Sequence, residues 1–403
     1  MAKSKSENFD FDGVGDDLNG LGERLKKDFA IQLKKASELV AASLIPTGIF
    51  TIDYANGGGI PDHAQSMFHG QKSSGKTTTA LNLAREVLIK YPDKEVLYGA
   101  IEKGAFDKSW AEAVIGSEYL DRVRVIDGIQ YGEEWAATVE DAIELNKISL
   151  IITDSIPALL PEEDVERAAD EESRMGANAR MCKLLMKKYN KSRTYLEKKE
   201  TEAIRIGHPY RSHIPAMLNL NQRRELVGSR LPAASIPGGK ELQHNQILIM
   251  EFKGSSLEED GKDVVRSIHN FNLGGGNNRN KATGVMIKTG EFEIATSNLH
   301  PRVNRGHVDD YATVVKFAKE YGFLTGAGAG QQLAVLSDEK FRSQADIANR
   351  LVEDEEVFWL LKACIIAKKR LQTGLPMMPP DDYLQRCTSY QIKEVFDRVG
   401  FNY

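Results

Sequence analysis

The stretch GQKSSGKTTT, Gly70 to Thr79, decides how this sequence folds. Gly70, Gly75, Lys76 and Thr77 complete the pattern G-x-x-x-x-G-K-[ST], in which glycines let backbone N–H groups curl around a phosphate. An amphipathic helical pattern follows directly, and a helix N-terminus favours anions. The sequence therefore predicts a nucleotide site made of Gly70, Gln71, Lys72, Ser73, Ser74, Gly75, Lys76, Thr77 and Thr78.

Apolar, β-branched segments surround this loop and alternate with helical patterns. They are EVLYGAIE, RVRVID, SLIITDS, AMLNLN and NQILIMEF. This alternation is typical of a largely parallel sheet flanked by helices. The predicted fold class is α/β, a phosphate-loop NTPase core with a mostly parallel sheet.

Two carboxylates end predicted strands on the side where the phosphates would lie. Asp154 ends SLIITDS, about 80 residues after the loop, and with Thr77 it is the expected Mg²⁺ partner. Ser155 lies beside it. Glu102 ends EVLYGAIE, where a carboxylate can orient attacking water, although the same position suits a solvated loop glutamate.

Composition limits the function classes. The 403 residues are 28% charged and 41% hydrophobic, which is ordinary for a soluble globular protein. No apolar run reaches the ~18 residues of a membrane span and the N-terminus lacks a signal-peptide core, so a cytoplasmic protein is expected. Three dispersed cysteines suggest neither a disulfide framework nor a zinc site.

Charge is distributed unevenly along the chain. The net charge is −5, yet Arg174 to Arg230 contains fourteen Lys and Arg against four Glu and no Asp. Such asymmetry favours a surface that faces a polyanion, and a solvated basic helix is the alternative.

The chain divides into three predicted parts. Residues 1–43 are a flexible N-terminus followed by an oligomerisation helix from about Leu21 to Ser43, and residues 44–306 are the ATPase core. Residues 307–403 form a small C-terminal α/β domain rich in helical patterns.

The run IPTGIFTIDYANGGGIPDHAQSMFHGQKSSGKTT resembles the core of the RecA recombinases, with Thr47, Asp53 and the glycines 57 to 59 in register. Bacteriophage recombinases of the UvsX kind are similar as well, and the divergence suggests a phage protein or an equally distant member of the family. The resemblance implies a DNA-dependent ATPase that uses ATP and Mg²⁺ and forms helical filaments on single-stranded DNA. It also implies strand exchange with homologous duplex DNA, and single-strand-binding and mediator proteins as partners.

The resemblance also assigns residues. Lys76, Glu102 and Gln222 match the catalytic positions, and Gln222 follows Asn221 at a strand end. Asp107 and Trp110 match the adenine contacts. Arg279 and Lys281, in NNRNKATG, match two cations that reach the ATP of the neighbouring subunit.

The resemblance implies two DNA loops, a first within RMGANARM and a second within RELVGSRLPAASIPGGK. They are expected to hold DNA, because cations neutralise phosphates and apolar side chains wedge between bases. The stretch Lys199 to His213 has no counterpart in the family, and is either an added DNA contact or a surface loop. Two other functions stay open: a ring helicase or DNA motor on the same core, and a nucleotide-switched structural or regulatory protein. The expected DNA-binding residues are Arg174, Met175, Gly176, Arg180, Lys187, Arg223, Arg224, Val227 and Arg230.

Overall fold

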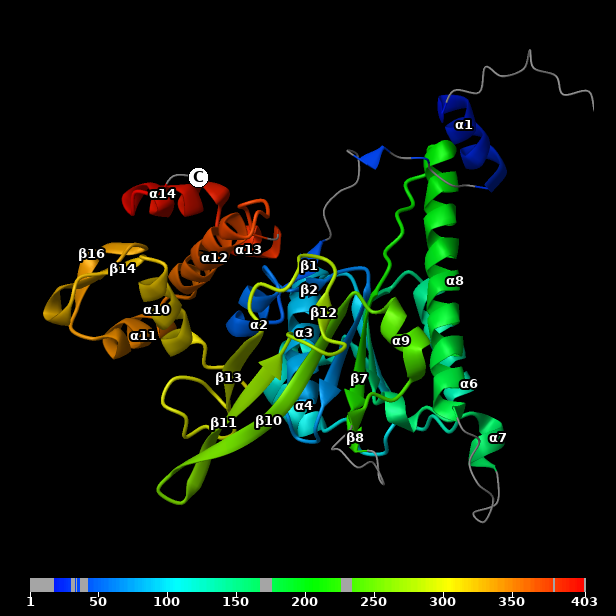
Figure 1. Cartoon of the computed structure of the whole chain (residues 1–403), viewed down its shortest axis with the longest axis horizontal. Coiled ribbons are helices and arrows are strands. Elements are labelled where there is room, and N and C mark those ends of the chain that lie inside the picture. Colours follow the sequence, from blue (N-terminus) through cyan, green and yellow to red (C-terminus); the bar gives the residue numbers. More distant parts are fainter. Residues whose placement is uncertain are drawn as a thin grey trace, which may run out of the picture.

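The structure, a computed structural model, describes residues 18–29, 33, 35–36, 43–166, 176–225, 234–379 and 381–401 of the chain. Figure 1 shows a central sheet with helices on both faces and a largely helical C-terminal domain beside it. None of the described helices combines the length and apolar character needed to cross a bilayer.

A nine-stranded sheet forms the centre of the molecule. Its order is β13-β11-β10-β3-β7-β6-β4-β5, and β12 pairs with β10 beside this row. The strands from β10 to β5 are parallel to their neighbours, whereas β11, β12 and β13 add antiparallel strands. The predicted α/β class with a mostly parallel sheet is confirmed. The strands are β3 (Gln65–Gly70), β4 (Glu95–Ala100), β5 (Val123–Ile126), β6 (Ile148–Asp154), β7 (Ala216–Gln222), β10 (Leu248–Asp260), β11 (Asp263–Asn272), β12 (Arg279–Asn280) and β13 (Thr289–Ala295).

Successive apolar residues in these strands pack against helices on opposite faces of the sheet, because side chains alternate between the two faces. Phe68 packs in the cluster that contains residues of α3 and α4, whereas its neighbour Met67 packs with α6 and α8. Burial on both faces explains why the strands read as continuous apolar runs. The helices are α3 (Lys76–Lys90), α4 (Lys108–Ile115), α6 (Gly132–Glu144) and α8 (Ala177–Arg205).

The C-terminal domain has its own apolar core, which also includes two buried residues of the part that contains the central sheet. Phe50 and Tyr54, from α2 (Phe50–Ala55), pack on Phe317, with ring centroids 5.4 and 4.7 Å from its ring. The two parts are therefore joined by shared apolar burial. The elements of the domain are α10 (Tyr311–Glu320), β14 (Leu324–Thr325), η4 (Gly328–Gly330), β15 (Gln331–Leu333), β16 (Leu336–Phe341), α11 (Gln344–Val352), α12 (Glu355–Gln372), α13 (Asp381–Arg386) and α14 (Ser389–Arg398).

Short elements complete the described fold. They are β1 (Leu44–Ile45), β2 (Ile60–Pro61), α5 (Ser117–Leu120), η3 (Ile156–Ala158), α7 (Glu162–Val165), β8 (Arg224–Glu225), β9 (Ala234–Ser235) and α9 (Gly239–Asn245).

The predicted N-terminal helix from Leu21 to Ser43 is wrong in its bounds. The helix α1 spans Leu18–Phe29, and Leu33 is not helical. Leu33 lies against Gly22, with its Cβ 3.6 Å from the point that a glycine Cβ would occupy. Residues 30–32, 34 and 37–42 of the predicted helix lie outside the described part of the chain. Residues 1–17 lie outside the described part of the chain.

Candidate active site

The phosphate loop joins β3 to α3, and two of its glycines are required by the space around them. Gly70 has φ +151°, and a Cβ there would lie 1.8 Å from the carbonyl oxygen of Phe252. Gly75 has φ +94°, and its Cβ would lie 2.7 Å from Nδ1 of His269. A side chain at either position would collide with the sheet as well as strain the backbone.

Lys76 begins α3 and points into the loop. Its Nζ donates to the carbonyl oxygens of Gly70 and Gln71, at 3.3 and 2.5 Å, and to Ser74 Oγ at 3.3 Å. Burial lowers the pKa of Lys76 to about 8, although the charges of Asp154 and Glu102 oppose this effect. An ammonium group held inside the loop by backbone carbonyl oxygens suits a phosphate ligand.

Asp154 and Thr77 meet beside the loop, as the sequence predicted. Thr77 Oγ1 donates to Asp154 Oδ2 at 3.1 Å, and the Tyr98 hydroxyl donates to the same oxygen at 2.5 Å. Burial raises the pKa of Asp154, while these two hydrogen bonds act in the opposite direction. A hydroxyl and a carboxylate are hard oxygen ligands, so this pair fits Mg²⁺.

Glu102 lies at the same edge of the sheet, in contact with residues that end two neighbouring strands. Ser155 Oγ donates to its Oε1 at 2.5 Å, and Gln222 Nε2 donates to the same oxygen at 2.9 Å. The contacts come about because β4, β6 and β7 are parallel neighbours and their carboxyl ends coincide. Two hydrogen bonds thus hold the Glu102 side chain in place, which disfavours a freely solvated loop glutamate, and its role in hydrolysis stays a prediction.

A short helix, α4, and its N-cap provide the two residues that are expected to contact the adenine. Asp107 caps α4 by accepting a hydrogen bond from the backbone N–H of Trp110 at 3.1 Å. The Trp110 indole Nε1 donates to Thr78 Oγ1 at 3.0 Å, which connects the ring to the phosphate loop. An aromatic ring held next to a phosphate site can stack on a nucleobase.

A cavity of about 460 Å³ runs from the loop to Trp110, and its floor comes from strands that sequence reasoning did not assign to the site. The register places Ser255 opposite His269, and Ser267 opposite Ile294, so their side chains share one face. His269 Nε2 shares a hydrogen bond with Ser267 Oγ at 2.8 Å, and burial lowers the pKa of His269. The cavity is lined by Ser73, Ser74, Gly75, Lys76, Thr77, Thr78, Trp110, Ser255, Leu257, Ser267, His269, Ile294 and Thr296.

The expected first DNA loop is described only at its end. Gly176 has φ +83° and is the N-cap of α8, where the loop meets the helix. Arg174 and Met175 lie outside the described residues. In the second loop Val227 and Arg230 also lie outside them, and for Arg224 only the backbone, in β8, is described.

The other three expected DNA cations lie on the surface in different settings. The side chain of Arg180 lies 3.6 Å from a carboxylate oxygen of Asp164, and Arg223 donates to Glu251 at 2.7 Å. Lys187 is exposed on α8. Their roles stay predictions.

Arg279 and Lys281 lie at the opposite edge of the sheet from the phosphate loop of their own chain. β12 pairs Arg279 with Ile249, near the amino end of β10, while Phe252, farther along, pairs with Gly70. Arg279 Nη2 contacts the carbonyl oxygens of Gln243 and Gln246, the latter at 3.2 Å. Burial lowers the pKa of Arg279. These cations therefore do not complete the site within one chain.

Comparison with known proteins identifies the family to which this chain belongs. The family model for the RecA N-terminal domain matches residues 16–228. The chain belongs to the RecA family of recombinases. Protein RecA of Mycoplasma genitalium is 30% identical over 297 residues, which are 73% of this chain and 76% of the relative.

Two further RecA relatives show how far the similarity extends. Protein RecA of Malacoplasma penetrans is 29% identical over 251 residues, 60% of this chain and 67% of the relative. Protein RecA of Chloroherpeton thalassium is 25% identical over 357 residues, 85% of this chain and 86% of the relative. The RecA resemblance is therefore confirmed, and a phage source stays a prediction.

Proposed function

We propose that this RecA-family chain is a DNA-dependent ATPase that forms filaments on single-stranded DNA and promotes homologous pairing and strand exchange. The observation that carries the proposal is the joined site at the carboxyl edge of the sheet. There the Thr77–Asp154 pair lies beside the phosphate loop, and Glu102 is held by Ser155 and Gln222.

Each group has a role in hydrolysis. Lys76 and the loop N–H groups hold the phosphates, and Thr77 and Asp154 would hold Mg²⁺, whose charge stabilises the phosphate oxygens when it is bound. Glu102 accepts a proton from the attacking water, because a positioned carboxylate is a suitable general base.

Gln222 connects this chemistry to DNA. It ends β7, and the chain then continues through Arg223 and β8 toward the second DNA loop. A ligand that draws the Gln222 amide away from Glu102 also moves the start of that loop. Nucleotide state and DNA affinity are coupled in this way, and by linkage the coupling acts in both directions.

Filament formation on DNA tests the proposal. We expect ATP turnover to rise when single-stranded DNA is added, and micrographs with a nonhydrolysable ATP analogue to show helical filaments on the strand. Lys76→Ala is the matched control, because it should remove nucleotide-dependent turnover. Closed six-membered rings would indicate a ring helicase or DNA motor. The absence of salt-sensitive affinity for single-stranded DNA would indicate a structural or regulatory protein.

A further inference from the structure

The segment between β13 and α10 forms a closed loop beside the cavity. Its ends are hydrogen-bonded to each other, since the Gly306 N–H donates to the Ala295 carbonyl at 2.8 Å and the Ala295 N–H donates to the His307 carbonyl at 2.9 Å. Ile294 and Val308 form an antiparallel bridge next to them. The loop thus returns to the strand whose Ile294 lines the cavity.

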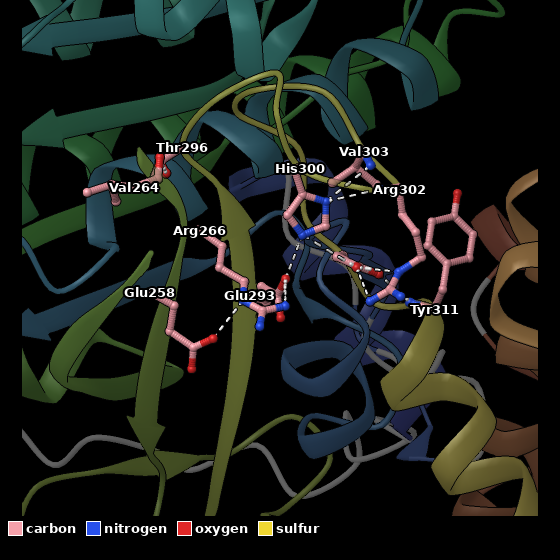
Figure 2. Close-up of polar contacts among 10 residues, drawn as sticks. Glu258, Val264, Arg266, Glu293, Thr296, His300, Arg302, Val303 and Tyr311 are labelled. Carbon is pink, nitrogen blue, oxygen red and sulfur yellow. Dashed lines mark hydrogen bonds and ion pairs between the residues drawn. The ribbon is translucent and has the colours of Figure 1, made fainter. Parts of the chain in front are cut away.

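A partly buried network of hydrogen bonds and ion pairs holds this loop (Figure 2). His300 Nε2 lies 2.6 Å from Glu293 Oε1, and Arg302 Nε donates to Asp309 Oδ2 at 2.6 Å. Arg266, on β11, reaches Glu293 at 3.3 Å. The ligand atoms of Glu293, His300 and Asp309 lie within 4.8 Å of one another, but the two arginines already compensate the carboxylates, so the cluster is an anchor for the loop.

The anchored loop lies directly on α4, the helix that carries Trp110. A Cβ on Gly306, which has φ +89°, would lie 2.8 Å from the carbonyl carbon of Ala113, so only glycine allows this approach. Its neighbour Arg305 extends over Trp110, with the guanidinium carbon 4.9 Å from the ring centroid. Arg305 Nη1 also contacts Ser109 Oγ at 3.4 Å.

Trp110 is consequently held in two ways. Its Nε1 is fixed by Thr78, and its ring is covered by Arg305. Trp110 lines the cavity, whereas Arg305 is not one of the described residues that line it. A cation over one face of an indole is attracted by the ring's electrons and restrains its rotation.

We propose that Arg305 is a positioning residue for the nucleobase: it holds Trp110 from outside, so that a purine stacks on the ring face that lines the cavity. The inference rests on the proposed function, because it requires that ATP occupy this cavity. A bare polyphosphate has no base to stack, so Arg305 should matter only for ligands that carry one.

Affinities for ATP and inorganic tripolyphosphate, measured by calorimetry with the full chain, test this role. Arg305→Ala should weaken ATP binding about 3- to 10-fold, the size expected for a partly exposed cation–π contact, and leave tripolyphosphate binding unchanged. Arg305→Lys should recover most of the ATP affinity, because it retains a cation. Lys316→Ala, which removes an exposed cation from α10, should change neither affinity.

Trp110→Ala separates failure of this inference from failure of the proposed site. If Trp110→Ala selectively weakens ATP binding while Arg305→Ala has no effect, only the role of Arg305 is wrong. If neither variant changes ATP affinity, the nucleobase site itself is wrong. An equal loss for ATP and tripolyphosphate in Arg305→Ala would also overturn the inference, because the effect would then concern the phosphates.

Discussion

Glu102 uses one of its two carboxylate oxygens for both hydrogen bonds that hold it. Ser155 and Gln222 both donate to Oε1. Neither of them donates a hydrogen bond to Oε2. The second oxygen is thus available to a water molecule. This arrangement gives Glu102 a fixed orientation, which a general base needs.

Replacement of Glu102 should separate binding from chemistry. Glu102→Gln keeps a side chain of the same shape but cannot take a proton, so we expect ATP affinity to persist and hydrolysis to slow by about 10²–10⁴. Turnover and nucleotide binding would be measured with saturating single-stranded DNA. Hydrolysis at the wild-type rate would remove Glu102 from the role of general base.

Sequence reasoning predicted those candidate site residues that belong to a motif or end an apolar strand. The phosphate loop, Asp154 and Glu102 were predicted for these reasons, and the structure brings them together. Ser267, His269 and Arg305 were not predicted. Ser267 and His269 reach the cavity through strand register, and Arg305 reaches Trp110 through the packing of its loop, neither of which a local pattern contains.

The antiparallel part of the sheet is the element that sequence reasoning did not foresee. The outer half of β10 is polar and mostly exposed, and β11 alternates buried with partly exposed residues, so neither shows the continuous apolar run of the parallel strands. Their signal was the Asp260–Gly261 dipeptide, because Gly261, with φ +69°, makes a two-residue turn possible. Buried strands can be predicted from their apolar runs, whereas paired surface strands can be predicted only from the turn that joins them.

The joint between α2 and α10 depends on a buried carboxyl group. Asp310 Oδ2 accepts a hydrogen bond from the Phe50 N–H at 2.6 Å, and the side chain is buried near Lys362 and Asp309. Burial raises the pKa of Asp310 to about 6. The folded state therefore holds this proton more tightly than the unfolded state does.

The stability contributed by Asp310 should consequently fall as the pH rises from about 4 to about 6, and stay lower above that range. Asp310→Asn carries no titrating proton, so its unfolding free energy should lack this decline. Between pH 4.5 and 7.5 the two proteins should differ in pH dependence by about 2 kcal/mol, measured by urea unfolding. Identical pH profiles would show that Asp310 does not titrate in this interval.

At the scale of the whole molecule, the two halves of the proposed catalytic site lie on opposite edges of one sheet. The phosphate loop follows the carboxyl end of β3, whereas β12, with Arg279, pairs near the amino end of β10. A head-to-tail assembly brings such unlike edges together, and it grows into a helix when the rotation does not close. Filament formation and catalysis then share one contact.

A lone subunit should accordingly bind ATP and hydrolyse it poorly, because cations supplied in trans can contribute 10³–10⁵ to the rate of phosphoryl transfer. We would mix a chain carrying Arg279→Ala and Lys281→Ala with a chain carrying Lys76→Ala, under conditions where both assemble on single-stranded DNA. Each is expected to be inactive alone. At a mixed contact, the intact phosphate loop of the first faces the intact cations of the second.

Turnover recovered in the mixture would support catalysis across the subunit contact, and its rate should depend on the mixing ratio, because only one of the possible contacts joins two intact halves. The control is each variant alone at the same total concentration and the same DNA coverage. Wild-type turnover by the Arg279→Ala/Lys281→Ala chain alone would rule the mechanism out, since the phosphate loop of that chain would then need no cation from its neighbour.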